Sequence, residues 1–286
     1  MVVLVTGALG QLGQAIQFIA SDYDGIEFIF TSYDSLDITD AEKVNHFFET
    51  NKIDYCINAA AYTAVDKAET ETSDAELINV VGAKNLAIAC QKYKVTLLHV
   101  STDFVFDGTA SAPYLETDNP NPVNVYGQTK LDGELAVIEN LHAYFIIRTS
   151  WVYSQFANNF MKTMLRLASE RDSLSIVSDQ IGTPTNAVDL AKALILIINH
   201  SQLPTSNSQH FYGIYNFSNE GEASWYDFAK EIFRINKVEI DLKPIPTEAF
   251  PTPAKRPKYS VLNKSKIKNT FGLQIKSWQE SLLQIV

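Results

Sequence analysis

The stretch Val2-Val-Leu-Val-Thr6-Gly7-Ala-Leu-Gly10-Gln-Leu-Gly13 decides the fold of this chain. Val2–Thr6 is a short run of apolar, mostly β-branched residues, which is typical of a buried strand. A glycine-rich turn follows at once, and Leu12, Ile16 and Ile19 then recur with helical spacing. A strand, a glycine-rich turn and a helix in this order place backbone N–H groups at a helix N-terminus, where they can bind a pyrophosphate.

The glycines of this turn predict a dinucleotide site. Gly7 would allow the tight turn, Gly10 the close approach of the cofactor, and Gly13 the close packing of helix on strand. Their spacing is Gly-x-x-Gly-x-x-Gly and not the standard Gly-x-Gly-x-x-Gly. A turn without a ligand is therefore the alternative interpretation.

The second predicted strand, Ile26–Phe30, leaves the kind of cofactor open. An acid at its end would hold a ribose hydroxyl, and an arginine would accept a 2′-phosphate. The chain continues with Thr31-Ser32-Tyr33-Asp34, which has no acid directly at the strand end and no Arg or Lys nearby. We therefore expect NADPH or NADH without a choice between them.

The remaining patterns predict the fold class. Three more apolar runs read as strands, at Tyr55–Asn58, Thr96–Ser101 and Tyr144–Thr149, and helical patterns separate them. Five strand–helix units in series, with no internal repeat, predict an α/β fold with a Rossmann-like doubly wound parallel sheet.

The regular alternation of predicted strands and helices ends after residue 150, which predicts two domains. We expect residues 1–150 to form an NAD(P)-binding Rossmann domain, completed by about 175–212. Residues 151–174 and 213–286 should form a smaller α/β C-terminal substrate-binding domain. A polar stretch at 201–209 is expected to be an exposed loop.

A second informative stretch is Asn-Val-Tyr126-Gly-Gln-Thr-Lys130, at 124–130. Leu131, Leu135 and Ile138 follow at spacings of four and three, which predicts a helix with an apolar face. Tyr126 and Lys130 stand four residues apart, so both side chains project from the same side of that helix. A phenol next to an ammonium group can act as an acid, because the positive charge favours the phenolate. By itself the pair is also a common coincidence.

Polar side chains follow the strand at Thr96–Ser101. The hydroxyls of Ser101 and Thr102 come at its carboxyl end, where open α/β sheets bind their ligands. Lys255, Arg256 and Lys258 form the one compact basic cluster, in a proline-rich loop. This cluster is either a solvated patch or a site for a pair of phosphates.

Composition and charge limit the possible partners. The net charge of −10 disfavours nonspecific binding to nucleic acid or to an anionic membrane. Cys56 and Cys90 lie in apolar surroundings and are typical of buried thiols in a reducing compartment. No segment resembles a signal peptide or a membrane span, so we expect a cytoplasmic protein. No His, Cys or carboxylate cluster has metal-ligand spacing, so no metal site is predicted.

Five motifs in one order carry a resemblance to a known family. They are Thr6–Gly13, Asn58–Glu69, Ser101–Gly108, Tyr126–Lys130 and Arg148–Tyr153. In this order they resemble the extended short-chain dehydrogenase/reductases over nearly the whole chain. The resemblance implies NAD(P)H-dependent reduction of a nucleotide-sugar ketone, and specifically conversion of dTDP-4-dehydro-L-rhamnose to dTDP-L-rhamnose, a precursor of cell-surface polysaccharide.

The resemblance also implies roles for individual residues. Thr102 would hydrogen-bond the substrate carbonyl, Tyr126 would be the general acid, and Lys130 would bind the nicotinamide ribose and lower the pKa of the phenol. Phe104 stands where the family usually has a tyrosine, which removes one hydroxyl near the substrate. The expected cofactor contacts are Gly7, Gly10, Gln11, Leu12, Asp37, Ile38, Ala60, Ala61, Tyr62, Thr63, Tyr126 and Lys130. The expected substrate contacts are Val65, Thr102, Asp103, Phe104, Tyr126, Trp151 and Arg256.

Two alternative functions fit the same patterns. One is a reductase of another nucleotide-4-ketosugar, or one that forms the opposite C4 epimer. The other is a non-catalytic subunit of the same fold that binds NADP and regulates a partner enzyme. A homodimer is a further expectation, although the helix after Tyr126 offers a polar outer face at Asp132, Glu139 and Asn140.

Overall fold

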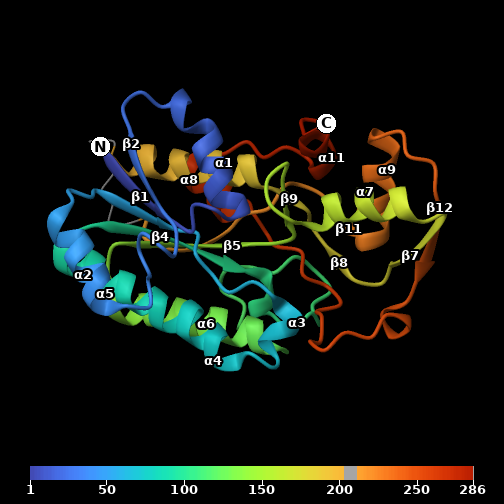
Figure 1. The fold of residues 1–286 in the computed structure, drawn as a ribbon, viewed down its shortest axis with the longest axis horizontal. Helices are drawn as coiled ribbons and strands as arrows, with labels where there is room; N and C mark the ends of the chain where they lie inside the picture. Colours follow the sequence, from blue (N-terminus) through green and yellow to red (C-terminus); the bar gives the residue numbers. More distant parts are fainter. Residues whose placement is uncertain (203–210, 286) are drawn as a thin grey trace.

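Six parallel strands form the central sheet of the computed structural model, which describes residues 1–202 and 211–285 (Figure 1). Their order across the sheet is β10-β5-β4-β3-β1-β2. The chain turns from one side of β1 to the other between β2 and β3, and ligands bind at such a point in open α/β sheets. The predicted doubly wound parallel sheet is therefore confirmed. The strands are β1 Val2–Thr6, β2 Glu27–Thr31, β3 Tyr55–Asn58, β4 Thr96–Thr102, β5 Tyr144–Thr149 and β10 Gly213–Asn216.

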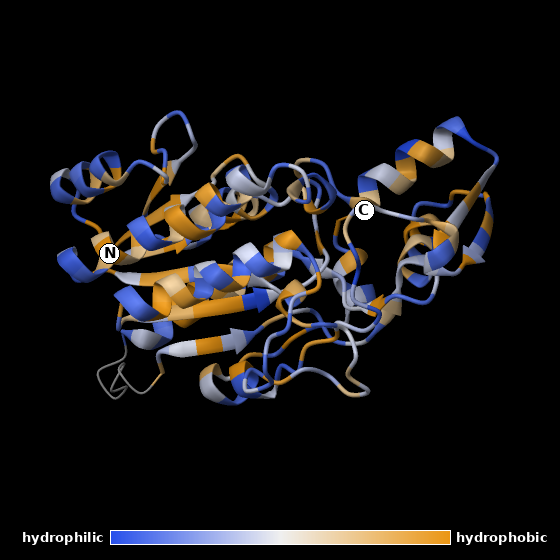
Figure 2. Ribbon diagram, turned by 90° about the horizontal axis from the view of Figure 1, so that it is seen from below, coloured by the Kyte–Doolittle hydropathy of each residue, from blue (hydrophilic) through white to orange (hydrophobic). Residues whose placement is uncertain are grey.

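Helices cover both faces of this sheet. Side chains alternate between the faces along each strand, so Val3 and Val5 of β1 join one core and Leu4 joins the other. Figure 2 shows that the strands are mostly hydrophobic, whereas the helices carry both hydrophobic and hydrophilic residues. The first face packs on α1 Gln11–Ile19, α8 Ala187–Ser201 and α10 Ser265–Phe271. The second packs on α2 Ala41–Thr50, α5 Ala83–Tyr93 and α6 Val125–Asn140.

The loop after β3 runs through a series of short helical segments before α5. They include a π-helical segment, in which each turn is one residue wider than in an α-helix. Its Asn79 side chain accepts a hydrogen bond from the Tyr62 backbone N–H and donates to the Tyr62 carbonyl and the Thr129 hydroxyl. The segments are α3 Val65–Ala68, α4 Thr72–Glu76 and the π-helix Leu77–Gly82.

A smaller group of elements lies beyond the carboxyl ends of the strands (Figure 1). It has its own core, in which Phe228 and Trp278 are buried. Its helices are α7 Phe160–Glu170, α9 Trp225–Ile235 and α11 Trp278–Leu282. Its strands form three two-stranded sheets, which pair β7 Ser173–Val177 with β12 Asp241–Ile245, β6 Val152–Tyr153 with β9 Thr185–Asn186, and β8 Ile181–Gly182 with β11 Ala223–Ser224.

Several segments lie elsewhere than the predicted domain division put them. The short strands β8 and β9 pair in the smaller group, although about 175–212 was assigned to the Rossmann domain, and α10 packs on the central sheet, although 213–286 was assigned to the smaller domain. Gly213–Asn216, expected in the smaller domain, pairs with β5 and completes the central sheet. Ser173–Val177, partly assigned to the Rossmann domain, pairs with β12 in the smaller group. These last two segments are short strands, and their sequences do not indicate which other strand they pair with. The domain of each is therefore known only from the pairing in the folded structure. The predicted loop at 201–209 lies mostly outside the described residues.

The first turn has the geometry that its glycines predict. Gly7 has a φ of +68°, and a Cβ there would come within 2.6 Å of the Ala60 backbone nitrogen. A Cβ at Gly13 would lie 2.4 Å from the Gly7 carbonyl oxygen. The helix therefore packs directly on the turn, as expected.

The outward face of α6 differs from the prediction. Leu135 and Ile138 were expected on a packed apolar face, but they are 47% and 37% exposed. The side that faces the sheet carries Tyr126, Lys130 and Glu134, all buried. The helical period was right, but a buried face built of polar residues cannot be recognised from hydrophobicity alone.

No helix in the described ranges 1–202 and 211–285 is long and apolar enough to cross a bilayer.

The close contact at Gly13 predicts a stability effect. Gly13→Ala should lower the free energy of unfolding by about 1–3 kcal/mol, because the added methyl group meets backbone that cannot move aside. Gly25→Ala is the matched control, since a Cβ there meets nothing within 4 Å. Chemical denaturation measures both. Equal stability of the two variants would contradict the tight packing of α1 on the turn.

Candidate active site

A cavity of about 590 Å³ opens at the carboxyl ends of the central strands. This volume is within the usual range for a small-molecule site. Residues from the smaller group and from the elements around the central sheet line it, including Trp225 of α9 in the smaller group and Leu190 of α8 on the sheet. The predicted site residues that line it are Gly10, Gln11, Leu12, Ala61, Thr63, Val65, Thr102, Asp103, Phe104, Tyr126, Lys130, Trp151 and Arg256.

Five predicted cofactor residues lie outside the lining of this cavity. Gly7 and Ala60 touch each other behind the turn. Ile38 is buried against Gly82, and Asp37 accepts hydrogen bonds from the backbone and the hydroxyl of Thr39. The hydroxyl of Tyr62 donates to Glu71. Their contacts with a cofactor stay predictions.

The strand end of β4 and the start of α6 bring Thr102 and Tyr126 together. The Asn124 side chain caps α6 by accepting a hydrogen bond from the Gly127 N–H at 2.7 Å. The buried phenol of Tyr126 lies close enough to the Thr102 hydroxyl for this hydroxyl to act on its pKa. The Thr102 hydroxyl donates to Asp103 Oδ1 at 3.1 Å and accepts from the Phe104 N–H at 3.2 Å. A hydroxyl and a phenol therefore lie side by side in the cavity.

The expected lowering of the phenol's pKa is not found. Burial raises the pKa of Tyr126 to about 12, the nearby Thr102 hydroxyl opposes this rise, and the charge of Asp103 adds to it. The Lys130 ammonium does not point at the phenol but donates to the Val100 carbonyl at 2.7 Å. The predicted pKa shift failed for two reasons: the sequence does not show that the phenol is buried, and it does not show that the lysine bonds to the Val100 carbonyl. A phenol with a high pKa keeps its proton at neutral pH and can act as a proton donor.

Lys130 is almost completely enclosed. Burial lowers the pKa of its ammonium group to about 8, and the negative charge of Glu134 opposes that shift. His99 on β4 faces it, and burial together with the positive charge of Lys130 depresses the pKa of His99 strongly. At neutral pH the site therefore holds a neutral imidazole and a largely charged ammonium group.

The start of α1 fits a diphosphate. Gly10 caps the helix with extended backbone, and no side chain accepts hydrogen bonds from its first N–H groups. No acidic residue lies in its first turn. Free N–H groups and the positive end of the helix dipole favour an anion at this position. Gly10, Gln11 and Leu12 could hold the diphosphate of a dinucleotide, and Lys130 could hold the ribose next to its reactive ring.

Two stacked tryptophans line the side of the cavity that the smaller group of elements forms. The rings of Trp151 and Trp225 stack at 3.5 Å between centroids and 6° between planes. Trp151 has a φ of +45°, and a Cβ on Gly182 would collide with its ring. Trp151 was predicted to contact a sugar, whereas Trp225 was missed. No local motif marks Trp225, because it directly follows the Ser224 cap of α9 and resembles any first-turn residue.

Arg256 closes another side of the cavity. Its guanidinium donates to Asp66 Oδ2 at 2.8 Å and lies over the ring of Phe104 at 6.0 Å from the centroid. Phe104 in turn meets the Tyr126 ring edge-to-face at 5.6 Å. The guanidinium is partly exposed and is therefore available to an anionic ligand.

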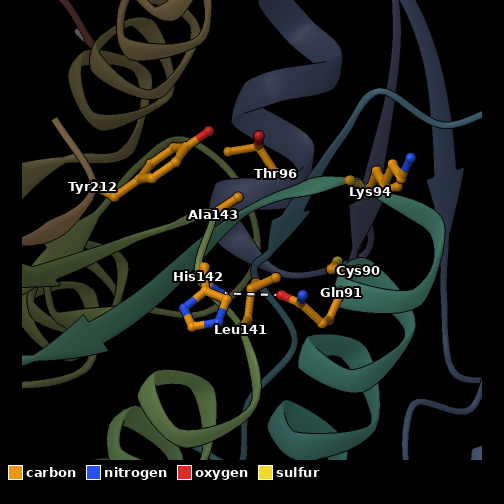
Figure 3. A pocket seen from close by; sticks show the side chains of 9 residues that line it. Cys90, Gln91, Lys94, Thr96, Leu141, His142, Ala143 and Tyr212 are labelled. Atoms are coloured by element: carbon orange, nitrogen blue, oxygen red, sulfur yellow. Dashed lines mark hydrogen bonds between the residues drawn. The ribbon is translucent and has the colours of Figure 1, made fainter. Parts of the chain in front are cut away.

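A second cavity of about 610 Å³ lies at the opposite edge of the sheet (Figure 3). Its lining includes Thr96 and Ala143, which lie where β4 and β5 begin. The backbone N–H of His142 donates a hydrogen bond to Gln91 Oε1 there at 3.2 Å. None of the predicted site residues lines it. The candidate acid–base groups belong to the cavity at the carboxyl edge alone.

Comparison with known proteins identifies the relatives of the chain. The sequence pattern of the RmlD substrate binding domain matches residues 1–286. The dTDP-4-dehydrorhamnose reductase of Aggregatibacter actinomycetemcomitans is 42% identical over 99% of this chain and 97% of its own length.

Two crystal structures agree closely with the fold. A dTDP-4-dehydrorhamnose reductase from Clostridium acetobutylicum has a TM-score of 0.93 at 44% identity, covering 100% of this chain and 98% of its own. The enzyme of that name from Bacillus anthracis, in complex with NADP, has a TM-score of 0.92 at 40% identity. It covers 99% of this chain and 98% of its own.

The buried carboxyl of Asp103 predicts a pH-dependent stability. Burial raises its pKa to about 6, so the folded protein binds this proton more tightly than the unfolded chain does. The contribution of Asp103 to the free energy of unfolding is fully present below the pKa that this carboxyl has in the unfolded chain. The contribution is lost as the pH rises through the pKa of the carboxyl in the folded protein. Between pH of about 4.5 and 7 the loss should be about 2 kcal/mol.

Asp103→Asn should remove this dependence, because an amide does not titrate in the range. Chemical denaturation of both proteins at the two pH values measures it. A stability difference between wild type and variant that stays constant over the range would show that Asp103 ionises freely in the folded state.

Proposed function

The chain belongs to the RmlD substrate binding domain family, and from this membership we propose that it reduces the C4 ketone of dTDP-4-dehydro-L-rhamnose to give dTDP-L-rhamnose. The observation that best supports this proposal is that Thr102, Tyr126 and Lys130 line one cavity. The chain is also about 40% identical to proteins named dTDP-4-dehydrorhamnose reductase. The partner is a small molecule, a dTDP-sugar, and the reductant is NADPH or NADH. The relative bound to NADP supports NADPH as the first choice.

With the diphosphate of the dinucleotide held at the start of α1, its reduced nicotinamide would supply hydride to the sugar ketone. The residues of the chain orient the ketone and supply the proton. Tyr126 keeps its proton at neutral pH because burial raises its pKa to about 12. As the C4 oxygen gains negative charge, the phenol can donate that proton.

Thr102 and Lys130 complete the polar surroundings of the oxygen. The single hydroxyl hydrogen of Thr102 points to Asp103 in this structure, so it must turn toward the carbonyl oxygen when the ketone binds. The Lys130 ammonium, which donates to the Val100 carbonyl in this structure, would have to turn toward the phenol to stabilise the negative charge that Tyr126 acquires as it loses its proton. Trp151 and Trp225 line the cavity and would exclude water from the reacting groups once the substrate is bound.

The nucleotide end of the substrate would meet Arg256. We assign the diphosphate of the dTDP-sugar to this guanidinium, since a planar fork of N–H donors suits phosphate oxygens. The net charge of −10 makes a local cation necessary for an anionic substrate. The ion pair with Asp66 holds the Arg256 side chain at the cavity.

We further propose that two copies of the chain associate through the exposed face of α5 and α6. Exposed apolar side chains gather on the outer sides of the π-helix, α5 and α6, which pack together. They are Leu77, Val81, Ile88, Leu135 and Ile138. The polar outer face expected from sequence is thus only part of that surface. Light scattering after size-exclusion chromatography measures the mass directly, and a monomer at all concentrations would refute the pairing.

The cytoplasm is the proposed compartment, and the two buried free thiols at Cys56 and Cys90 support a reducing environment.

The proposed function predicts a specific assay result. The protein should oxidise NADPH, measured by loss of its absorbance, on addition of dTDP-4-dehydro-L-rhamnose, and should form dTDP-L-rhamnose. Other dTDP-, GDP- and UDP-4-ketosugars serve as comparison substrates. If neither NADPH nor NADH is oxidised with any of them, a non-catalytic role is the better interpretation. Faster turnover of another ketosugar would reassign the substrate.

Replacement of the proposed acid predicts a defect in chemistry and not in binding. Tyr126→Phe should lower kcat by about 10²–10⁴-fold, the usual contribution of a general acid, and leave the Kd for NADPH nearly unchanged. Tyr153→Phe is the matched control, because that buried phenol bonds the Trp278 carbonyl away from the cavity. Thr102→Val should reduce kcat as well. Turnover of Tyr126→Phe equal to the control would remove Tyr126 from the mechanism.

A further inference from the structure

Three side chains from three elements meet beneath the cavity. Glu134 of α6 accepts hydrogen bonds from Arg148 of β5, with Nε at 2.9 Å from Oε1 and Nη2 at 2.6 Å from Oε2. Ser101 of β4 donates its hydroxyl to the same carboxylate at 2.5 Å. The ion pair is buried, since the side chains of Arg148 and Glu134 are 2% and 1% exposed.

The fold places these groups in register with the candidate catalytic residues. Ser101 and Arg148 are direct neighbours across β4 and β5, and the next pair in the register is Thr102 with Thr149. On α6, Tyr126, Lys130 and Glu134 follow one another at intervals of four residues and so lie on one face. The same contact therefore joins the strand end that carries Thr102 to the helix face that carries Tyr126.

We propose that Glu134, held by Arg148 and Ser101, is a positioning residue that fixes Tyr126 and Lys130 of α6 against the end of β4. The inference rests on the proposed reductase function of the cavity and adds residues that do not touch the substrate. A rigid helix transmits the position of one turn to the next two. Because a misplacement of about 1 Å can reduce a rate by about 100-fold, such an anchor matters for turnover.

Stability alone is a poor reason for this ion pair. Removing two charges from water is costly, and apolar residues of similar volume often stabilise a protein equally well or better. One guanidinium nitrogen, Nη1 of Arg148, is buried without a hydrogen-bond partner among the described residues. The pair therefore leaves a polar group unsatisfied, while it fixes the orientation of α6 through three directional bonds.

Glu134 also acts on the charge of Lys130. Burial lowers the pKa of the ammonium group to about 8, and Glu134 is the group that opposes this shift. His99 faces Lys130 from β4, Arg148 lies beyond Glu134 on β5, and Asp103 lies at the strand end near Tyr126. Reduction needs the ammonium form, so the rate should fall as the pH rises through the pKa of Lys130. Loss of the Glu134 charge should move that fall to lower pH.

The first test replaces the carboxylate by an amide. Glu134→Gln should lower kcat about tenfold or more, with the Kd for NADPH changed by less than about threefold. The alkaline limb of the kcat profile should move down by on the order of one pH unit. Glu170→Gln is the matched control, because it makes the same change in an exposed pair with Arg166 and should alter neither. A kcat within about twofold of wild type and an unmoved limb would overturn the inference.

A second variant separates positioning from stability. Glu134→Met with Arg148→Met removes both charges and should fold with a Tm at or near that of wild type. We expect its kcat to stay low despite that stability. If the double variant regains wild-type kcat, the ion pair is only structural and the inference is wrong.

A third measurement does not depend on turnover. In lysine-labelled protein, an NMR titration of Lys130, assigned with Lys130→Arg, should show a lower midpoint in Glu134→Gln than in wild type. An unchanged midpoint would be sufficient to refute the proposed effect of Glu134 on the pKa of Lys130. If the wild-type protein reduces no ketosugar, the proposed function fails, and this titration still decides whether Glu134 controls Lys130.

Discussion

The packing of α6 against the carboxyl ends of β4 and β5 is the constraint on which the rest of the site depends. The helix also packs closely on neighbouring segments. A Cβ at Gly127 would lie 2.2 Å from the carbonyl oxygen of Phe104, in the turn after β4, and one at Gly133 equally close to the carbonyl oxygen of Asn79 in the π-helix. Buried hydrogen bonds from Glu134 then orient the helix. This contact sets the phenol of Tyr126 beside the hydroxyl of Thr102, and without it the cavity would hold neither group in place.

A row of polar side chains on the same face of the sheet supports that packing. Thr6, Asn58 and His99 are neighbours across β1, β3 and β4, and they form a continuous chain of hydrogen bonds at 2.7 and 3.0 Å. Its end lies next to Lys130, whose charge helps to keep His99 neutral. This face of the sheet is therefore polar at positions that could have been part of an apolar core. Polar networks of this kind give a unique arrangement when their members are paired, and here Nε2 of His99 is buried without a hydrogen-bond partner in the part of the chain that the structure describes.

The sequence was sufficient for the parts whose patterns are local. Strands such as Val2–Thr6 and the glycine turn follow from apolar runs and spacing, and the family resemblance named thirteen residues that line one cavity. Features set by tertiary contact were not predictable. The buried face of α6 was predicted wrongly because it is polar. Gly213–Asn216 was assigned to the wrong domain because its partner strand is distant in the chain. Trp225 was missed because no motif marks it. The direction of the Tyr126 pKa shift was predicted wrongly, because burial raises this pKa and the charge of Lys130 is not among the causes that act on it.

The central claim is that one cavity brings the reactive carbon of a reduced nicotinamide next to the ketone carbon of a sugar. The most direct measurement uses NADPH with deuterium at either of the two C4 positions and mass spectrometry of the dTDP-sugar product. Direct transfer predicts a single deuterium at C4 of the product sugar from one of the two labelled cofactors, and none from solvent. Product without deuterium from both cofactors would contradict the account, because the two carbons would then not meet in this cavity.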